Sequence, residues 1–144
     1  MSQNAALEAF CAFFDKLDKN CTSKLYDVYT PDVVFIDPLH RIEGAKALEA
    51  YFAGMYANVS RCRFDYHDKH RHGDTAFVSW TMTFAHPKLN RGREISVDGC
   101  TRLQFAADGR VARHRDYFDA GAMLYEQVPL LGRAVRWLKH RASR

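Results

Sequence analysis

The sequence contains no long hydrophobic run, because no apolar stretch approaches the roughly 20 residues that a membrane-spanning helix needs. Its beginning, MSQNAALEAF, has neither the basic start nor the apolar centre of a signal peptide. The four cysteines, Cys11, Cys21, Cys62 and Cys100, form no CxxC pair and have no metal-ligand spacing. We therefore expect a cytoplasmic protein with free thiols, and neither a metal nor an organic cofactor.

Basic excess is also absent from most of the chain. The formal net charge is +4, but the last twelve residues hold five of the 21 Lys and Arg side chains and no acid. The rest carries 16 basic and 17 acidic side chains. A globally basic protein is typical of nucleic-acid binding, so this distribution predicts no nucleic-acid partner.

The 144 residues suffice for one domain, 1–144, with a single core, and no internal repeat, linker or low-complexity segment divides them. Hydrophobic residues make up 47% and aromatic residues 13% of the chain. This abundance of rings suits a well-packed core or a pocket for an apolar ligand.

Helical spacing dominates the first third of the chain. A first helix is predicted from the apolar positions Leu7, Phe10, Cys11, Phe14 and Leu17. A second, short helix containing Tyr26 and Tyr29 is expected to end at Pro31, and VVFIDP (33–38) then predicts a short strand. Gly44 opens a third helix, AKALEAYFAGMYA.

From Arg61 onward the spacing of the apolar residues is no longer helical. Four segments of about a dozen residues are separated by the turn signals HGD (72–74), HPKLNRG (86–92) and ADG (107–109), which predicts a four-stranded antiparallel meander. A final helical region begins near Asp119, is interrupted at Pro129, and ends in a basic tail. Helices followed by strands predict an α+β fold with the helices on one face of a curved sheet.

The segment HRDYFD (114–119) poses a question about the last strand. Alternation places Asp116 on the same face as Ala112 and Phe118. A carboxylate on that face is either a structural anchor or a catalytic group, if the face is buried.

The element order, the motif FIDP, the glycine-led helix after it and DGRVARHRDYFD resemble the nuclear transport factor 2-like superfamily, in particular the SnoaL-like polyketide cyclase and ketosteroid isomerase-related branch. The resemblance covers nearly the whole chain. It implies a cone-shaped α+β fold in which N-terminal helices pack on a highly bent antiparallel sheet that encloses a pocket.

Ketosteroid isomerase-like enzymes place a general base before a proline, where Asp37 stands here. Their oxyanion donors, a first-helix tyrosine and a protonated aspartate, correspond to Phe13 and Thr101. A supporting third-helix tyrosine falls on Phe52, with Tyr51 one residue away. Since each oxyanion donor commonly contributes ~3 kcal/mol to the transition state, their loss argues against that reaction.

Two other activities of this superfamily use an aspartate of the last strand, which Asp116 matches. Limonene-epoxide hydrolase-like members also need an arginine and a second aspartate, but Trp80 and Met82 occupy those positions. SnoaL-like polyketide cyclases rely chiefly on the last-strand aspartate alone. The residues contradict this branch least.

The resemblance implies that Ala112, His114, Asp116 and Phe118 face the pocket. Burial disfavours the charged form of a carboxylate, which would suit Asp116 to acid–base chemistry, with His114 tuning it or sharing its proton. Asp116 could instead be a structural acid, His114 a satisfied half-buried histidine, and Asp37 an ordinary turn residue.

The candidate catalytic residues are thus Asp116, Asp37 and His114. Candidate ligand-binding residues are Phe13, Tyr51, Phe52, Trp80, Met82, Thr101 and Phe118, although aromatic stripes are also typical of a core. Strand alternation places His67 on the opposite face from His70, with His72 at a turn, so no metal site is expected.

The tail 130–144 is amphipathic, with Leu130, Leu131, Ala134, Val135 and Leu138 on one side and cations around the rest. Such a helix could touch an anionic membrane surface weakly, or cap the cone mouth or a dimer partner. A homodimer through the outer face of the sheet is expected, using the outward residues Arg113, Arg115, Tyr117, Asp98 and Arg102.

Two functions remain open at this point. One is a cofactor-independent isomerase, cyclase or hydrolase that uses aspartate acid–base chemistry on a hydrophobic small molecule. The other is a non-catalytic module of the same fold that binds a ligand or a protein. An enzyme needs Asp37 or Asp116, whereas a binding module needs neither.

Overall fold

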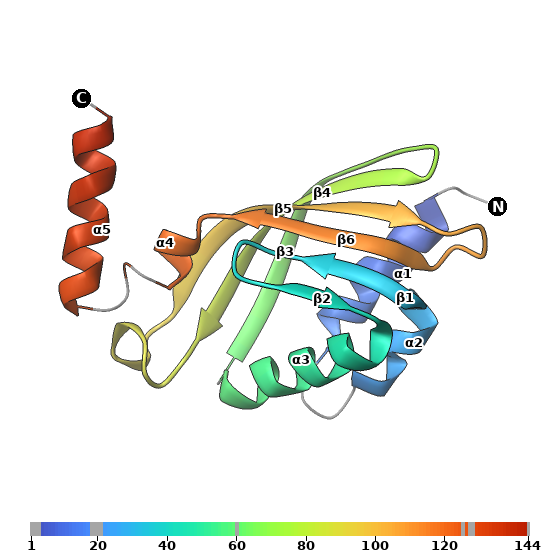
Figure 1. The fold of residues 1–144 in the computed structure, drawn as a ribbon, viewed down its shortest axis with the longest axis horizontal. Helices are drawn as coiled ribbons and strands as arrows, with labels where there is room; N and C mark the ends of the chain where they lie inside the picture. Colours follow the sequence, from blue (N-terminus) through green and yellow to red (C-terminus); the bar gives the residue numbers. More distant parts are fainter. Residues whose placement is uncertain (1–3, 18–21, 60, 125, 127–128, 144) are drawn as a thin grey trace.

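The chain folds into one curved sheet with helices packed on its concave side (Figure 1). The computed structural model describes residues 4–17, 22–59, 61–124, 126 and 129–143. Cys21 and Arg144 lie outside these ranges. In chain order the elements are α1 (Asn4–Asp15), η1 (Thr22–Lys24), α2 (Leu25–Val28), β1 (Tyr29–Ile36), β2 (Arg41–Glu43), α3 (Ala45–Asn58), β3 (Arg61–His72), β4 (Thr75–Ala85), η2 (Asn90–Gly92), β5 (Ile95–Phe105), β6 (Val111–Phe118), α4 (Ala120–Met123) and α5 (Pro129–Ala142).

The six strands lie in the order β2-β1-β6-β5-β4-β3. Strands β3 to β6 form the predicted antiparallel meander, and the sheet is curved without closing into a barrel. Strand β1 joins the meander by pairing in parallel with β6, which connects the first strand of the chain to the last one. The α+β class and the cone are therefore confirmed.

Helices α1 and α3 supply the helical half of the core. The buried face of α3 consists of Ala45, Leu48, Phe52 and Tyr56, which recur at helical spacing. This helix begins as predicted after Gly44, whose φ of 92° favours glycine and whose N–H donates to the Val33 carbonyl.

Strand β1 begins earlier than the sequence indicated. Tyr29 and Pro31, expected to be the end of a helix and its stop, both belong to this strand, and α2 is only four residues long. The register against β6 shifts between Tyr29 and Val34. Pro31 has no N–H to donate, and such an irregularity tolerates it. The short β2 was not predicted, because three residues are too few to show alternation.

A bulge in β3 corrects the expected placement of the histidines. The register shifts between Tyr66 and Lys69, so one extra residue enters the strand. His67 contacts Thr81 and His70 pairs with Phe77, which places both on the outer face of the sheet. Among the described residues, no group of three His, Cys, Asp or Glu side chains could hold a metal ion.

Helix α5 lies away from the sheet (Figure 1). Lys139 donates to the carboxylates of Asp119 and Glu126, and Arg136 donates to the Glu126 carbonyl. The apolar side of this helix is exposed, with Leu130 81% and Trp137 59% accessible. None of the helices in the described ranges is both long and apolar enough to span a membrane.

Gly99 provides a test of sheet packing. It lies opposite Trp80, and a Cβ added there would come within 2.3 Å of the indole ring. We expect Gly99→Ala to displace the ring and to lower the free energy of unfolding by about 1–3 kcal/mol. Gly54→Ala is the control, because nothing lies within 4 Å of its added Cβ and alanine is favoured in a helix by roughly 0.5–1 kcal/mol. Equal melting temperatures for the two variants would contradict this account.

Candidate functional site

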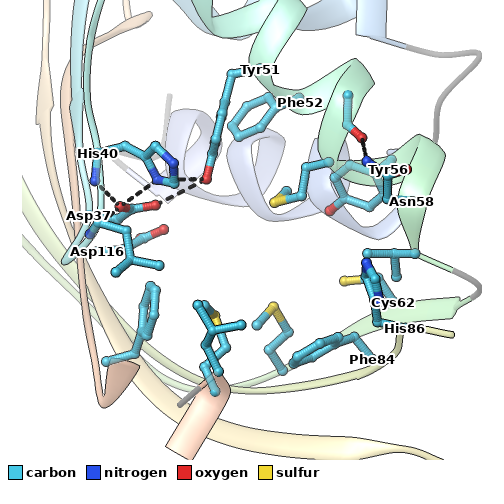
Figure 2. A pocket seen from close by; sticks show the side chains of 18 of the residues that line it. Asp37, His40, Tyr51, Phe52, Tyr56, Asn58, Cys62, Phe84, His86 and Asp116 are labelled. Carbon is cyan, nitrogen blue, oxygen red and sulfur yellow. Dashed lines mark hydrogen bonds and ion pairs between the residues drawn. The ribbon is translucent and has the colours of Figure 1, made fainter. Parts of the chain in front are cut away.

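A cavity of about 550 Å³ lies between α3 and the concave side of the sheet (Figure 2). Its wall is mainly aromatic and sulfur-containing, with Phe14, Phe35, Phe52, Phe64, Trp80, Phe84, Phe118, Met55, Met82 and Met123. The volume is within the range of small-molecule sites. The predicted pocket is therefore present, and its wall suits an apolar ligand.

Polar side chains gather at one end of this cavity, where Asp37, His40, Tyr51 and Asp116 face one another (Figure 2). The parallel pairing of β1 with β6 explains the position of the two acids. Ile36 is paired with Arg115, so the residues that follow them, Asp37 just after β1 and Asp116 within β6, lie at the same level of the sheet.

The carboxylate of Asp37 is fully occupied by its own turn. Its Oδ1 accepts hydrogen bonds from the backbone N–H groups of Leu39 at 2.8 Å and His40 at 2.7 Å, and the Nδ1 of His40 lies at 3.2 Å. Its Oδ2 accepts the hydroxyl of Tyr51 at 3.2 Å. Burial, followed by the charge of Asp37, raises the pKa of Tyr51, so this hydroxyl keeps its proton. Asp37 therefore closes the β1–β2 turn.

Asp116 is held through only one of its two oxygens. Its Oδ1 accepts from Thr101 Oγ1 at 2.6 Å and from His114 Nε2 at 2.7 Å. Thr101 in turn accepts from Trp80 Nε1 at 2.7 Å. No side chain in the described part of the protein donates to Oδ2, and the carboxylate points into the cavity (Figure 2).

His114 connects Asp116 to the core. Its Nδ1 lies 2.7 Å from the hydroxyl of Tyr29. Burial, followed by the charge of Asp116, raises the pKa of Tyr29 well above 10, so the hydroxyl keeps its proton and can donate to Nδ1 of the neutral imidazole. In that tautomer Nε2 carries the ring hydrogen and donates to Asp116. The His114 side chain is 2% exposed and packs against the rings of Phe10 and Phe35.

Seven of the ten predicted site residues line the cavity: Asp37, Tyr51, Phe52, Trp80, Met82, Asp116 and Phe118. Three do not, which corrects their expected position. Phe13 packs in the core against Phe14 and Tyr29. Thr101 is buried between Trp80 and Asp116, and His114 is covered by the core aromatics, so both orient Asp116 without reaching the cavity.

Sequence reasoning missed several residues of the wall. His40 reaches the cavity because the turn after Pro38 folds back on Asp37, and this turn chemistry was the available signal. Tyr56 of α3 and Cys62 of β3 also line the cavity, and no local pattern links them. Burial raises the pKa of Cys62 to about 11, so this thiol is a poor nucleophile at neutral pH.

The C-terminal helices contribute unequally to the mouth of the cavity. Met123 and Leu124, in and just after α4, belong to the wall. Of the described residues of α5, none lines the cavity, and the apolar side of this helix is exposed. One interpretation of the sequence was that the tail caps the mouth of the cone. In the structure, the described part of the tail does not cap the cavity of its own chain.

The hydrogen bond between Tyr29 and His114 provides a second test. Tyr29→Phe leaves the buried Nδ1 of His114 without a donor, so we expect a loss of about 1–3 kcal/mol in the free energy of unfolding. Tyr26→Phe is the matched control, because the Tyr26 hydroxyl bonds Glu49 on the surface and its loss should cost less than ~0.5 kcal/mol. Urea denaturation measures both. Equal losses would mean that the buried hydrogen bond contributes no more to the free energy of unfolding than the exposed one.

The fold is shared with solved structures of low sequence identity. An NTF2-like protein of unknown function from Burkholderia pseudomallei is 17% identical over 86% of this chain and 96% of that one, with a TM-score of 0.74. A protein with a ketosteroid isomerase-like fold from Catenulispora acidiphila, in complex with trimethylamine, is 14% identical over 90% and 95%, with a TM-score of 0.73. TerC co-crystallised with polyporic acid is 21% identical over 82% and 92%, with a TM-score of 0.68.

None of the curated protein sequences matches the chain. The family comparison is decisive, because residues 9–114 match the SnoaL-like domain, which is more than half of the chain. The match extends from α1 into β6 and ends two residues before Asp116. The chain belongs to the SnoaL-like domain family.

Proposed function

We propose that the protein binds a hydrophobic small molecule in the cavity and that Asp116 serves as the general acid–base group of a cofactor-independent isomerase, cyclase or hydrolase. One observation carries this proposal. Asp116 has one oxygen fixed by Thr101 and His114, and its other oxygen faces an apolar cavity.

This arrangement suits proton transfer. The two hydrogen bonds to Oδ1 fix the side-chain rotamer and leave Oδ2 available to take a proton from a ligand C–H or O–H. The wall is mainly apolar, and electrostatic interactions with a reacting group are stronger in apolar surroundings than in water. The same oxygen can return the proton to another atom of the ligand.

The related structures are consistent with a small-molecule ligand. TerC was co-crystallised with polyporic acid, and the Catenulispora acidiphila protein is in complex with trimethylamine. At identities of 21% and 14%, these proteins support the fold and leave the ligand of this chain to be identified.

Binding without turnover is the second candidate. Asp37 is occupied by its turn, so the cavity has one free carboxylate. Neither lysine nor arginine is found in the described wall to stabilise a developing oxyanion. Stabilisation of an oxyanion is often the largest catalytic contribution. A wall without lysine or arginine therefore suits a module that binds a ligand without turnover, and this is the better description if Asp116 proves inactive.

Proton abstraction from 5-nitrobenzisoxazole tests Asp116 directly. In this neutral aromatic compound a base removes the ring C–H, the N–O bond breaks, and a coloured phenolate is released. We expect the wild-type protein to accelerate this reaction and Asp116→Asn to be slower by about a hundredfold. Asp116→Asn keeps a carbonyl for Thr101 and His114, so its melting temperature should stay close to that of the wild type.

Two control variants accompany this assay. Asp65→Asn removes a carboxylate that is 54% exposed and paired with Arg63, so it should leave the rate unchanged. Asp37→Asn weakens the turn and should cost less than about tenfold in rate. If Asp116→Asn is as fast as the wild type, or melts far below it, Asp116 is a structural anchor and the binding module is the better description.

We also propose a homodimer through the outer face of the sheet. Arg102 lies directly opposite Arg115, a like-charge pair that is unfavourable unless an acidic group compensates it. Phe77, opposite Arg102, is 46% exposed, as is Tyr117 on the same face. Arg115 lies over the ring of Tyr117. Exposed rings beside arginines are typical of a surface that a second chain covers.

Sedimentation velocity at tens of micromolar checks the dimer. We expect the wild-type protein to sediment as a dimer and Phe77→Glu to sediment as a monomer, because a charge would then be buried at the interface. Leu130→Glu on α5 should remain a dimer. A monomeric wild type, or dissociation by Leu130→Glu alone, would contradict the sheet-face dimer. Contact of α5 with an anionic membrane surface stays a prediction from its sequence.

A further inference from the structure

The charges of the cavity wall are one-sided. Among the described residues that line the cavity, Asp37 and Asp116 are the only acids, and none is a lysine or an arginine. The other groups that can titrate are His40, His86, Tyr51, Tyr56 and Cys62. Burial raises the pKa of both tyrosines and of the thiol, so these three are neutral.

The two acids differ in how far their charge is balanced. Asp37 receives two backbone N–H groups, a tyrosine hydroxyl and a contact with His40, whose side chain is 44% exposed to solvent. Asp116 receives one hydrogen bond from a hydroxyl and one from an imidazole, both on Oδ1, and none of the described side chains donates to its Oδ2. Asp116 is therefore the less fully hydrogen-bonded acid, and it borders an apolar space.

The effect of this charge extends around the cavity. Besides burial, which is the main cause, Asp116 contributes to the raised pKa of Tyr51 and Tyr56 on α3, and of Tyr66 on β3. Tyr51 and Tyr56 line the cavity, so the charge of Asp116 acts inside it. A bound anion would be repelled and a bound cation attracted.

Aromatic rings strengthen the same preference. Phe35, Phe52, Phe64, Trp80 and Phe118 are all part of the wall. The face of an aromatic ring carries partial negative charge and attracts organic cations, most strongly where water is excluded. A site with a carboxylate and several rings, but without a resident cation, is suited to a positively charged nitrogen on an apolar body.

We propose that the ligand of this cavity is a hydrophobic organic cation, such as an aromatic or aliphatic amine in its protonated form, with its nitrogen beside Oδ2 of Asp116. This inference rests on the proposed binding of a small molecule in the cavity and adds the charge of that molecule. An ammonium N–H can donate to the free oxygen, and its apolar body can occupy the aromatic part of the wall. A ligand with a carboxylate in the same position meets uncompensated negative charge and is excluded.

Three probes with the same apolar body and different charge test this proposal. They are 1-naphthylmethylamine, 1-naphthalenemethanol and 1-naphthoic acid, which at neutral pH are cationic, neutral and anionic. Titration calorimetry with the wild-type protein should give tighter binding of the amine than of the alcohol by about tenfold. The naphthoate should bind weaker than the amine by at least about a hundredfold.

Variants then identify the group responsible. Asp116→Asn should reduce the ratio of amine to naphthoate affinity by at least about tenfold and leave the alcohol nearly unchanged. Asp65→Asn removes one negative charge on the outside of β3, which is paired with Arg63, and should leave the ratio as in the wild type. A change of equal size in both variants would mean that net charge of the protein, and not the cavity, sets the preference.

The outcomes separate this proposal from the binding function on which it rests. If the alcohol binds and the naphthoate binds as tightly as the amine, the cavity is a small-molecule site without charge selection and the present inference is wrong. If none of the three probes binds, and the neutral fluorophore N-phenyl-1-naphthylamine also fails to bind, the small-molecule function itself is wrong.

Discussion

The parallel pairing of β1 with β6 is the contact on which the site depends. It brings the first strand of the chain beside the last one. Tyr29 is therefore within hydrogen-bond distance of His114, and Asp37 lies at the same level of the sheet as Asp116. The strands of the meander alone would place Asp116 on the concave face, but without β1 they would lack both the hydroxyl that orients the histidine and the turn that closes the polar end of the cavity. Parallel pairing needs a long connection between the strands, which here contains α3 and the rest of the sheet.

Two carboxylates at the same level of the sheet have different tasks because their partners differ. Asp37 stands at the end of β1, where the chain turns, and nearby backbone N–H groups occupy it. Asp116 lies inside β6, where the backbone N–H groups are used by neighbouring strands, so only side chains can bind it. This leaves Asp116 with a free oxygen in the cavity.

The cavity combines an apolar wall with a polar support that lies behind it. Trp80 is part of both, since its ring lines the cavity and its Nε1 donates to Thr101. His114 and Thr101 are buried and do not reach the cavity, yet they orient the carboxylate that does. Functional sites typically have this arrangement, in which buried hydrogen-bond partners hold the groups that line the cavity in one orientation.

Local patterns in the sequence predicted the α+β class, the main helices, the four strands of the meander and their three turns, because period, glycine and proline act over a few residues. The concave-facing position of Asp116 was implied by the family resemblance. Long-range contacts determine that Tyr29 belongs to a strand, that a bulge turns His67 and His70 to the same face, and that Phe13 lies in the core. The tertiary structure also determines that Asp116, and not Asp37, has a carboxylate oxygen without a hydrogen bond from the described side chains. The partners of these residues are far away in the sequence, as in the 85-residue separation of Tyr29 from His114, and no local pattern encodes a contact between such distant segments.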